Sequence, residues 1–158
     1  PPRSTLFPYT TLFRSYAARA GEVSIYPCGA DSTCLPSVAW HEGNSQQTPH
    51  PVAQLLPNAW NLYDMAGNVS EWVEDTISTN YDNTPTDGSA WVELGVTKRV
   101  VRGGAWDTPV ISTIHRSSYR GAYERVPNPP VNALGFRCSR DLLVDGDVDA
   151  EAEEEIDS

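Results

Sequence analysis

Two carboxylates flank a glycine turn in the segment NAWNLYDMAGNVSEWVE, residues 58–74. Asp64 precedes the Gly67-Asn68 dipeptide, which readily adopts positive φ, and Glu71 follows it. Hard cations such as Ca²⁺ take carboxylate and carbonyl oxygens as ligands, and a turn of this kind presents both. The alternative is that the two acids cap the turn and accept hydrogen bonds from backbone amides. The spacing alone leaves both interpretations open.

The three cysteines restrict thiol chemistry. Cys28 and Cys34 are six residues apart, and a disulfide closes that loop if their Cα atoms come within range. Two nearby cysteines without a matching His/Cys pair argue against a structural zinc site. No cysteine lies between Cys34 and Cys138. A Cys28–Cys34 bridge would imply an extracytoplasmic compartment.

Aromatic rings, arginines and histidines are the other side chains with functional potential. We expect four aromatic residues to fill a core rather than form a sugar-binding platform: Trp60, Tyr63, Trp72 and Trp106. We expect four arginines to anchor loops through bidentate hydrogen bonds: Arg102, Arg116, Arg120 and Arg137. Of these two groups, Trp106 and Arg120 are the candidates for a ligand groove. The scattered histidines, His41, His50 and His115, are predicted to be surface or loop residues, and no GxSxG, HExxH, P-loop or Rossmann motif is present.

Short elements must position these side chains, since thirteen Pro and eleven Gly indicate an irregular, loop-rich architecture. Residues 16–20 predict the last turn of a helix that ends at Gly21. Strands are predicted at residues 98–102 and 134–138, and residues 25–31 are strand-like before a turn. Residues 114–120 fit either a strand or an irregular segment. Residues 34–57 and 76–88 are predicted loops.

The charge distribution excludes one class of partner. The chain of 158 residues has a net charge of −10, but residues 141–158 carry nine of the 21 acidic residues and no basic one. The remainder, with 12 acidic and 11 basic residues, is close to neutral. We expect no nucleic-acid partner, because no basic stripe is available to release counterions. No apolar run approaches the roughly 20 residues of a membrane span.

Three blocks carry a family resemblance: residues 58–74, RVVRGGAW at 99–106 and GFR at 135–137. In this order they resemble the C-terminal half of the formylglycine-generating enzyme family, or sulfatase-modifying factor domains. The resemblance covers residues 16–140. It implies a C-type-lectin-like α+β fold, loop-rich and with little regular secondary structure, in a chain that is a C-terminal fragment.

The resemblance also implies metal chemistry. It suggests a structural Ca²⁺ site formed by the side chains of Asp64 and Glu71 and the carbonyls of Gly67 and Val69. Active members bind Cu(I) through a cysteine pair after Gly-Gly and oxidise a substrate cysteine with O₂. Here Thr108 stands at the first position and Ser112 lies near the second, and hydroxyls do not replace thiolates. We expect no copper and no such oxidase activity. In some members the cysteine matching Cys138 pairs with one in the N-terminal half, so Cys138 is either orphaned by truncation or a buried thiol.

The two ends of the chain are predicted to lie outside the domain at 16–140. Residues 1–15, PPRSTLFPYTTLFRS, repeat TLF and resemble translated sequencing-adaptor sequence, the alternative being a genuine β-rich leader. Residues 141–158 are predicted to form a disordered acidic tail. DGDVD within it fails the EF-hand pattern, because Ala150 replaces the required Gly and Ile156 the required Glu.

The predicted function is a divergent, non-catalytic binding or structural module of an extracytoplasmic bacterial protein. Its partner would be a protein, a peptide or a glycan. The alternative is an oxidoreductase of the formylglycine-generating class, or an iron-dependent relative, whose catalytic ligands lie in an N-terminal half.

Overall fold

The structure is a computed structural model that describes residues 7–8, 10–80, 82, 84–124 and 131–139. The predicted acidic tail at 141–158 lies outside the described residues, as do residues 1–6 and 9 of the N-terminal string.

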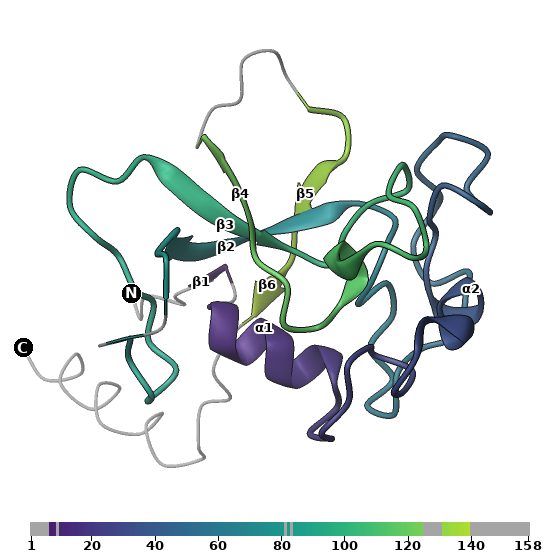
Figure 1. Ribbon diagram of the computed structural model, residues 1–158, viewed down its shortest axis with the longest axis horizontal. Coiled ribbons are helices and arrows are strands. Elements are labelled where there is room, and N and C mark those ends of the chain that lie inside the picture. The colour runs from purple at the N-terminus through teal and green to yellow at the C-terminus, as the bar shows by residue number, and fades with distance from the viewer. Residues whose placement is uncertain (1–6, 9, 81, 83, 125–130, 140–158) are drawn as a thin grey trace, which may run out of the picture.

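One mixed four-stranded sheet organises the domain (Figure 1). Its strands are β2 (Ser70–Thr76), β3 (Lys98–Arg102), β4 (Gly121–Glu124) and β5 (Leu134–Phe136), in the order β4-β3-β2-β5. β3 runs antiparallel to both β2 and β4, whereas β5 runs parallel to β2. A second, two-stranded sheet pairs β1 (Phe7–Pro8) with β6 (Cys138–Ser139). Strand β5, near the C-terminal end of the described chain, therefore returns beside β2, the strand that carries Glu71.

Helix α1 (Thr11–Ala18) packs against β2 and β3. Thr10 caps its first turn by accepting a hydrogen bond from the amide of Phe13 at 3.3 Å. The chain leaves the helix through Ala20 and Gly21, both at positive φ, so the predicted stop at Gly21 lies just beyond its end. The domain boundary predicted at Tyr16 falls inside α1. The adaptor origin of residues 1–15 stays a prediction.

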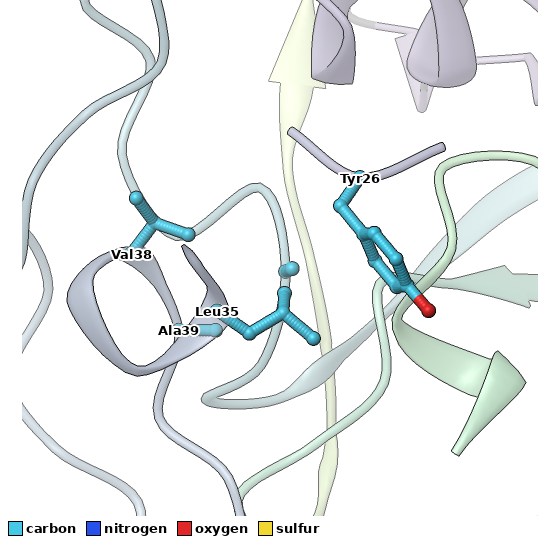
Figure 2. Packing of buried hydrophobic residues seen from close by; sticks show 5 residues of the cluster. Tyr26, Leu35, Val38 and Ala39 are labelled. Atoms are coloured by element: carbon cyan, nitrogen blue, oxygen red, sulfur yellow. The ribbon is translucent and has the colours of Figure 1, made fainter. Parts of the chain in front are cut away.

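The other helices of the described residues are short, namely η1 (Ser32–Cys34), α2 (Leu35–Val38) and η2 (Thr113–His115). Helix α2 lies at one edge of the molecule, away from the four-stranded sheet (Figure 1). A disulfide joins Cys28 to Cys34 with their Cα atoms 5.9 Å apart, which confirms the predicted bridge. Both cysteines pack against a cluster of five buried residues: Tyr26, Leu35, Val38, Ala39 and Ala66. Figure 2 shows Leu35 and Val38 on α2, with Tyr26 on a separate segment opposite them.

The predicted α+β fold with little regular structure is confirmed, and its elements agree with the sequence to different degrees. The strand at residues 98–102 is confirmed, and the one predicted at 134–138 is divided into β5 and β6. Residues 25–31 form no strand; Tyr26 and Gly29 make an isolated bridge instead, because the chain turns back at once to close the disulfide loop. Residues 114–120 are irregular apart from η2. Among the described residues, no helix is both long and apolar enough to span a bilayer.

Candidate functional site

The Gly67-Asn68 turn docks between two distant segments. Both residues have positive φ, as predicted from the dipeptide. The amide of Gly67 donates to the carbonyl of Gly103 at 2.9 Å, and the amide of Asn68 donates to the carbonyl of Trp40 at 2.8 Å. The amide of Trp106 in turn donates to the carbonyl of Asn68 at 2.8 Å. The turn therefore fixes the Gly103–Trp106 backbone relative to the start of β2.

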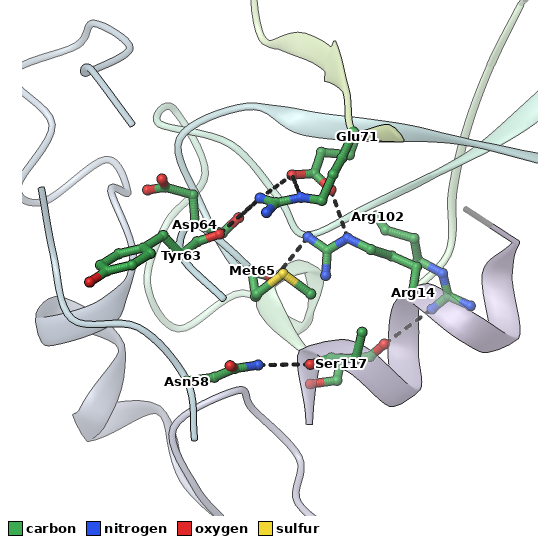
Figure 3. A network of polar contacts seen from close by, with 10 residues as sticks. Arg14, Asn58, Tyr63, Asp64, Met65, Glu71, Arg102 and Ser117 are labelled. Atoms are coloured by element: carbon green, nitrogen blue, oxygen red, sulfur yellow. Dashed lines mark hydrogen bonds and ion pairs between the residues drawn. The ribbon is translucent and has the colours of Figure 1, made fainter. Parts of the chain in front are cut away.

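Glu71 leaves this turn as a buried carboxylate, with a residue exposure of 6%. Its Oε2 accepts a hydrogen bond from Nε of Arg14 at 2.7 Å, and its Oε1 accepts from Nη2 and Nε of Arg137 at 2.8 and 3.1 Å. Figure 3 shows the carboxylate of Glu71 facing the guanidinium of Arg14. Burial by itself raises the pKa of the Glu71 carboxyl, but the charges and hydrogen bonds of Arg14 and Arg137 outweigh it and hold the pKa below its usual value.

The same two guanidinium groups also reach the carbonyls that precede the turn. Arg14 donates to Met65 at 3.1 Å, and Arg137 donates to Tyr63 and Asp64 at 2.8 and 3.4 Å. The carboxylate of Asp64 accepts from the amide of Ala53 at 2.8 Å. We call Glu71, Arg14, Arg137 and these three carbonyls the Glu71 network.

Calcium held by Asp64, Gly67, Val69 and Glu71 stays a prediction, but the described arrangement does not fit it. Both oxygens of Glu71 already accept hydrogen bonds from positively charged groups, and Asp64 is engaged with a backbone amide. Within the described part of the chain, no three His, Cys, Asp or Glu side chains are grouped so as to hold a metal ion. Asp64 accepts from a backbone amide, as in the alternative that the spacing left open, whereas Glu71 accepts from two guanidinium groups.

A second candidate site is a pocket formed in part by residues that follow the Gly103-Gly104 pair in the sequence. This pocket of about 110 Å³ is lined by side chains that include Asp107, Thr108, Tyr119 and Tyr123, and we call it the Thr108 pocket. The hydroxyl of Thr108 accepts a hydrogen bond from the amide of Ala105 at 3.2 Å. Its carbonyl accepts from the amide of Glu42 at 3.0 Å, which ties the 39–50 loop to one wall of the pocket.

Two of the histidines predicted to be surface or loop residues, His41 and His115, are buried beside this wall, His41 in a loop and His115 in η2. His115 is 1% exposed and His41 is 4% exposed, with their ring centroids 6.3 Å apart. The Nδ1 of His115 lies 3.3 Å from the carbonyl oxygen of Gly103, and its Nε2 lies 3.3 Å from that of Thr108. A Cβ on Gly104 would come within 2.7 Å of that ring, so the Gly-Gly pair was the one available signal that a bulky group packs there.

Burial lowers the pKa of His115, although its contacts with the Thr108 and Gly103 carbonyls act in the opposite direction. Burial also lowers the pKa of His41, and the nearby His115 lowers it further, against a smaller opposing effect of Glu42. The lowered pKa favours the neutral form of both rings inside the fold.

We expect the domain to lose stability as the pH falls below about 6.5, the pKa of histidine in an unfolded chain. Because the pKa of His115 is lowered in the folded state, the unfolded state binds more protons in that range. The stability that neutral, buried His115 contributes is complete above about pH 6.5 and is lost as the pH falls towards the folded-state pKa of His115. Melting temperatures between pH 8 and pH 5 should show this slope, and His115→Gln should reduce it. An unchanged slope in the variant would assign the effect to other groups.

The structure separates the two groove candidates. Trp106 lies between Ala105 and Asp107, two residues that line the Thr108 pocket, and its carbonyl accepts from the hydroxyl of Ser45 at 2.8 Å. Arg120 borders a different pocket of about 120 Å³ beside Asp75 and Trp91.

Two of the aromatic residues predicted to fill the core are exposed instead. Trp60 packs edge-on against Tyr16 at a centroid distance of 5.3 Å with nearly half its surface in solvent, and Tyr63 is also exposed. Cys138 is an exposed free thiol, so it is not the buried one that the sequence left open.

Comparison with known proteins gives the same family along most of the chain. The model of the sulfatase-modifying factor enzyme 1-like domain matches residues 10–142. The chain is 33% identical over 124 residues to a serine/threonine-protein kinase, pkn1, of Chlamydia caviae, which covers 73% of this chain and 18% of the relative. It is 33% identical over 98 residues to a formylglycine-generating enzyme of Thermomonospora curvata, covering 59% of this chain and 31% of that enzyme.

Two further similarities cover a larger share of the chain. The chain is 32% identical over 135 residues to the inactive Cα-formylglycine-generating enzyme 2 of Mus musculus, covering 78% of this chain and 39% of the relative. The solved structure of PvdO from Pseudomonas aeruginosa superimposes with a TM-score of 0.74 at 34% identity, over 85% of this chain and 52% of PvdO. The chain thus spans less than half of each of these sequence relatives and about half of the solved structure.

Proposed function

Because this chain belongs to the family of sulfatase-modifying factor enzyme 1-like domains, we propose that it is a divergent, non-catalytic member that binds a partner at the Thr108 pocket. The partner class is a protein, a peptide or a glycan. The single observation that carries the proposal is the state of the two hydroxyls that follow Gly103-Gly104.

Both hydroxyls have structural roles. Thr108, at the position that the family resemblance gives to the first cysteine, accepts a hydrogen bond from Ala105. Ser112, near the second position, caps η2 by accepting from the amide of Ile114 at 3.2 Å. Among the described residues, the cysteines are the Cys28–Cys34 disulfide and Cys138 on β6, so no thiol pair stands at the pocket. Cu(I) binding and a mixed disulfide with substrate both need thiolates there.

The pocket offers hydrogen bonding next to apolar surface. Asp107, Thr108 and Tyr119 supply polar groups, while Val101 and Ile114 supply aliphatic walls. Sites for drug-sized ligands usually enclose about 300–1,000 Å³. A volume of about 110 Å³ suits one side chain of a peptide or one substituent of a sugar. The proposal therefore describes an anchor point within a longer binding surface.

The disulfide supports an extracytoplasmic location for the domain. Bridges of this kind form and persist in oxidising compartments. The Cys28–Cys34 disulfide packs against the buried cluster that includes Tyr26 and Leu35. We include a periplasmic, secreted or cell-surface location in the proposal.

Two assays test the proposed function. Incubation with a CxPxR peptide, Cu(I) and O₂ is expected to leave the mass of the peptide cysteine unchanged. On peptide and glycan arrays, we expect Tyr123→Ala to weaken the strongest binder by about tenfold, a typical cost of truncating an aromatic side chain that contacts the partner. Leu94→Ala, at a fully exposed loop position, is the matched control.

The assays also address the alternative function. A formylglycine-generating enzyme is among the relatives, and this chain spans only 31% of it, so catalytic ligands can lie in sequence outside the match. Oxidation of the peptide cysteine would favour that oxidoreductase and contradict the non-catalytic role. Absence of any binder on both arrays would contradict the binding role.

A further inference from the structure

The Glu71 network collects hydrogen-bond acceptors as a cation site would. The two carboxylate oxygens of Glu71 and the carbonyls of Tyr63, Asp64 and Met65 belong to this network, whereas the Gly67 and Val69 carbonyls of the predicted calcium site do not. Calcium typically takes six to eight oxygens of these two kinds. In this chain, every one of the five acceptors receives a hydrogen bond from Arg14 or Arg137 instead.

The geometry of the two guanidinium groups suits this role. Arg14 spans Glu71 and Met65 through Nε and Nη2, at 2.7 and 3.1 Å. Arg137 spans the other oxygen of Glu71 and the carbonyl of Tyr63 through Nη2, both at 2.8 Å, with Nε adding a third bond at 3.1 Å. A planar fork of donors can serve a carboxylate and neighbouring carbonyls at once, which an ammonium group does less well.

The charge and burial of these side chains also favour arginine over a divalent cation at Glu71. The side chains of Arg14 and Glu71 are 2% and 8% exposed, and that of Arg137 is 27% exposed. The carboxylate of Glu71 is ion-paired with both guanidinium groups. A divalent cation among the same oxygens would face two like charges at close range in a poorly solvated site.

We propose that Arg14 and Arg137 take the place of a divalent cation in this domain, so that the 63–71 turn folds without calcium. The clamp also closes the fold, since Arg14 lies on α1, Arg137 lies between β5 and β6, and both bind β2 through Glu71. Both arginines fall within residues 10–142, the part matched by the family model. The inference does not depend on the function of the Thr108 pocket.

The test uses the full chain and needs no variant for its main result. Metal-free protein is melted in the presence of CaCl₂ and in the presence of EDTA, and calcium binding is followed by titration calorimetry. We expect equal melting temperatures and no binding heat. A lower melting temperature in EDTA, or saturable calcium binding that Asp64→Asn removes, would overturn the proposal.

A second comparison tests the arginines themselves. Arg137→Met should lower the melting temperature by several degrees, whereas Arg116→Met, at an exposed arginine, should leave it nearly unchanged. Arg137→Lys should recover only part of the loss, because the ammonium group keeps the charge but not the fork. Equal melting temperatures for Arg137→Met and Arg116→Met would contradict the clamp.

Discussion

Gly67→Ala is expected to destabilise the domain by about 2–5 kcal/mol, from strain at positive φ and overpacking against backbone. Gly67 has φ +71°, and a Cβ there would overlap the carbonyl oxygen of Trp40 and lie 2.8 Å from its amide nitrogen. Neither chain segment can move away freely. The amide of Gly67 is bonded to Gly103, and the amide of Asn68 is bonded to Trp40 itself.

Gly95→Ala separates the strain at positive φ from the overpacking against backbone. Gly95 has a similar φ of +84°, but an added Cβ would meet no atom within 4 Å. Its substitution should cost only about 1–2 kcal/mol, the conformational part. Urea unfolding of the two variants measures the difference. Equal losses at both positions would mean that the Trp40 backbone yields to the new methyl group and that the turn is less tightly docked than its hydrogen bonds indicate.

The features that the sequence predicts well are those with local causes. The positive φ of Gly67 and Asn68 follows from the conformational preferences of two residue types. The strand Lys98–Arg102 follows from a β-branched run that ends at a Gly pair, and the Cys28–Cys34 bridge from a spacing of six. The family resemblance supplies what such patterns cannot, namely the assembly of these pieces into one loop-rich α+β domain.

The features that the sequence misses depend on partners far along the chain. Arg14 and Glu71 are 57 positions apart and Arg137 is 66 positions beyond Glu71, so their convergence cannot be read from spacing. His115 is buried because the 39–50 loop and the Gly103-Gly104 segment close over it, although a lone histidine gives no sign of this. Trp60 is exposed because it packs on Tyr16 at the outer face of α1 rather than under the sheet.

In the candidate site, too, local features are predictable from the sequence and long-range contacts are not. Residue type and spacing place the carboxylates of Asp64 and Glu71 on either side of a glycine turn, and their role as calcium ligands stays a prediction. The groups that these carboxylates bind depend on the tertiary structure. Asp64 accepts from the amide of Ala53, and Glu71 accepts from two guanidinium groups. Thr108 could be selected from its place after Gly-Gly, whereas the Tyr119 and Tyr123 walls of its pocket come from β4 and the loop before it.

Glu71→Gln is expected to cost about 3–5 kcal/mol of unfolding free energy, the usual result of removing one partner from a buried ion pair. The amide keeps one acceptor oxygen, but its NH₂ group would point at the donors of Arg14 or Arg137. Arg14 would then be a buried charge without its counter-ion, since its Nε bonds Glu71 and its Nη2 bonds only the Met65 carbonyl. Guanidinium chloride unfolding at pH 7 measures the loss.

Glu74→Gln is the matched control, because Glu74 lies three residues further along β2, is only half-buried and takes no part in the Glu71 network. It should change stability by less than about 0.5 kcal/mol. The double variant Arg14→Met/Glu71→Leu should recover part of the loss, because buried pairs replaced by apolar groups leave no charge uncompensated, and Arg137 is exposed enough to turn towards solvent. A double variant less stable than Glu71→Gln would show that the carboxylate is needed for its hydrogen bonds to the turn and not only to neutralise Arg14.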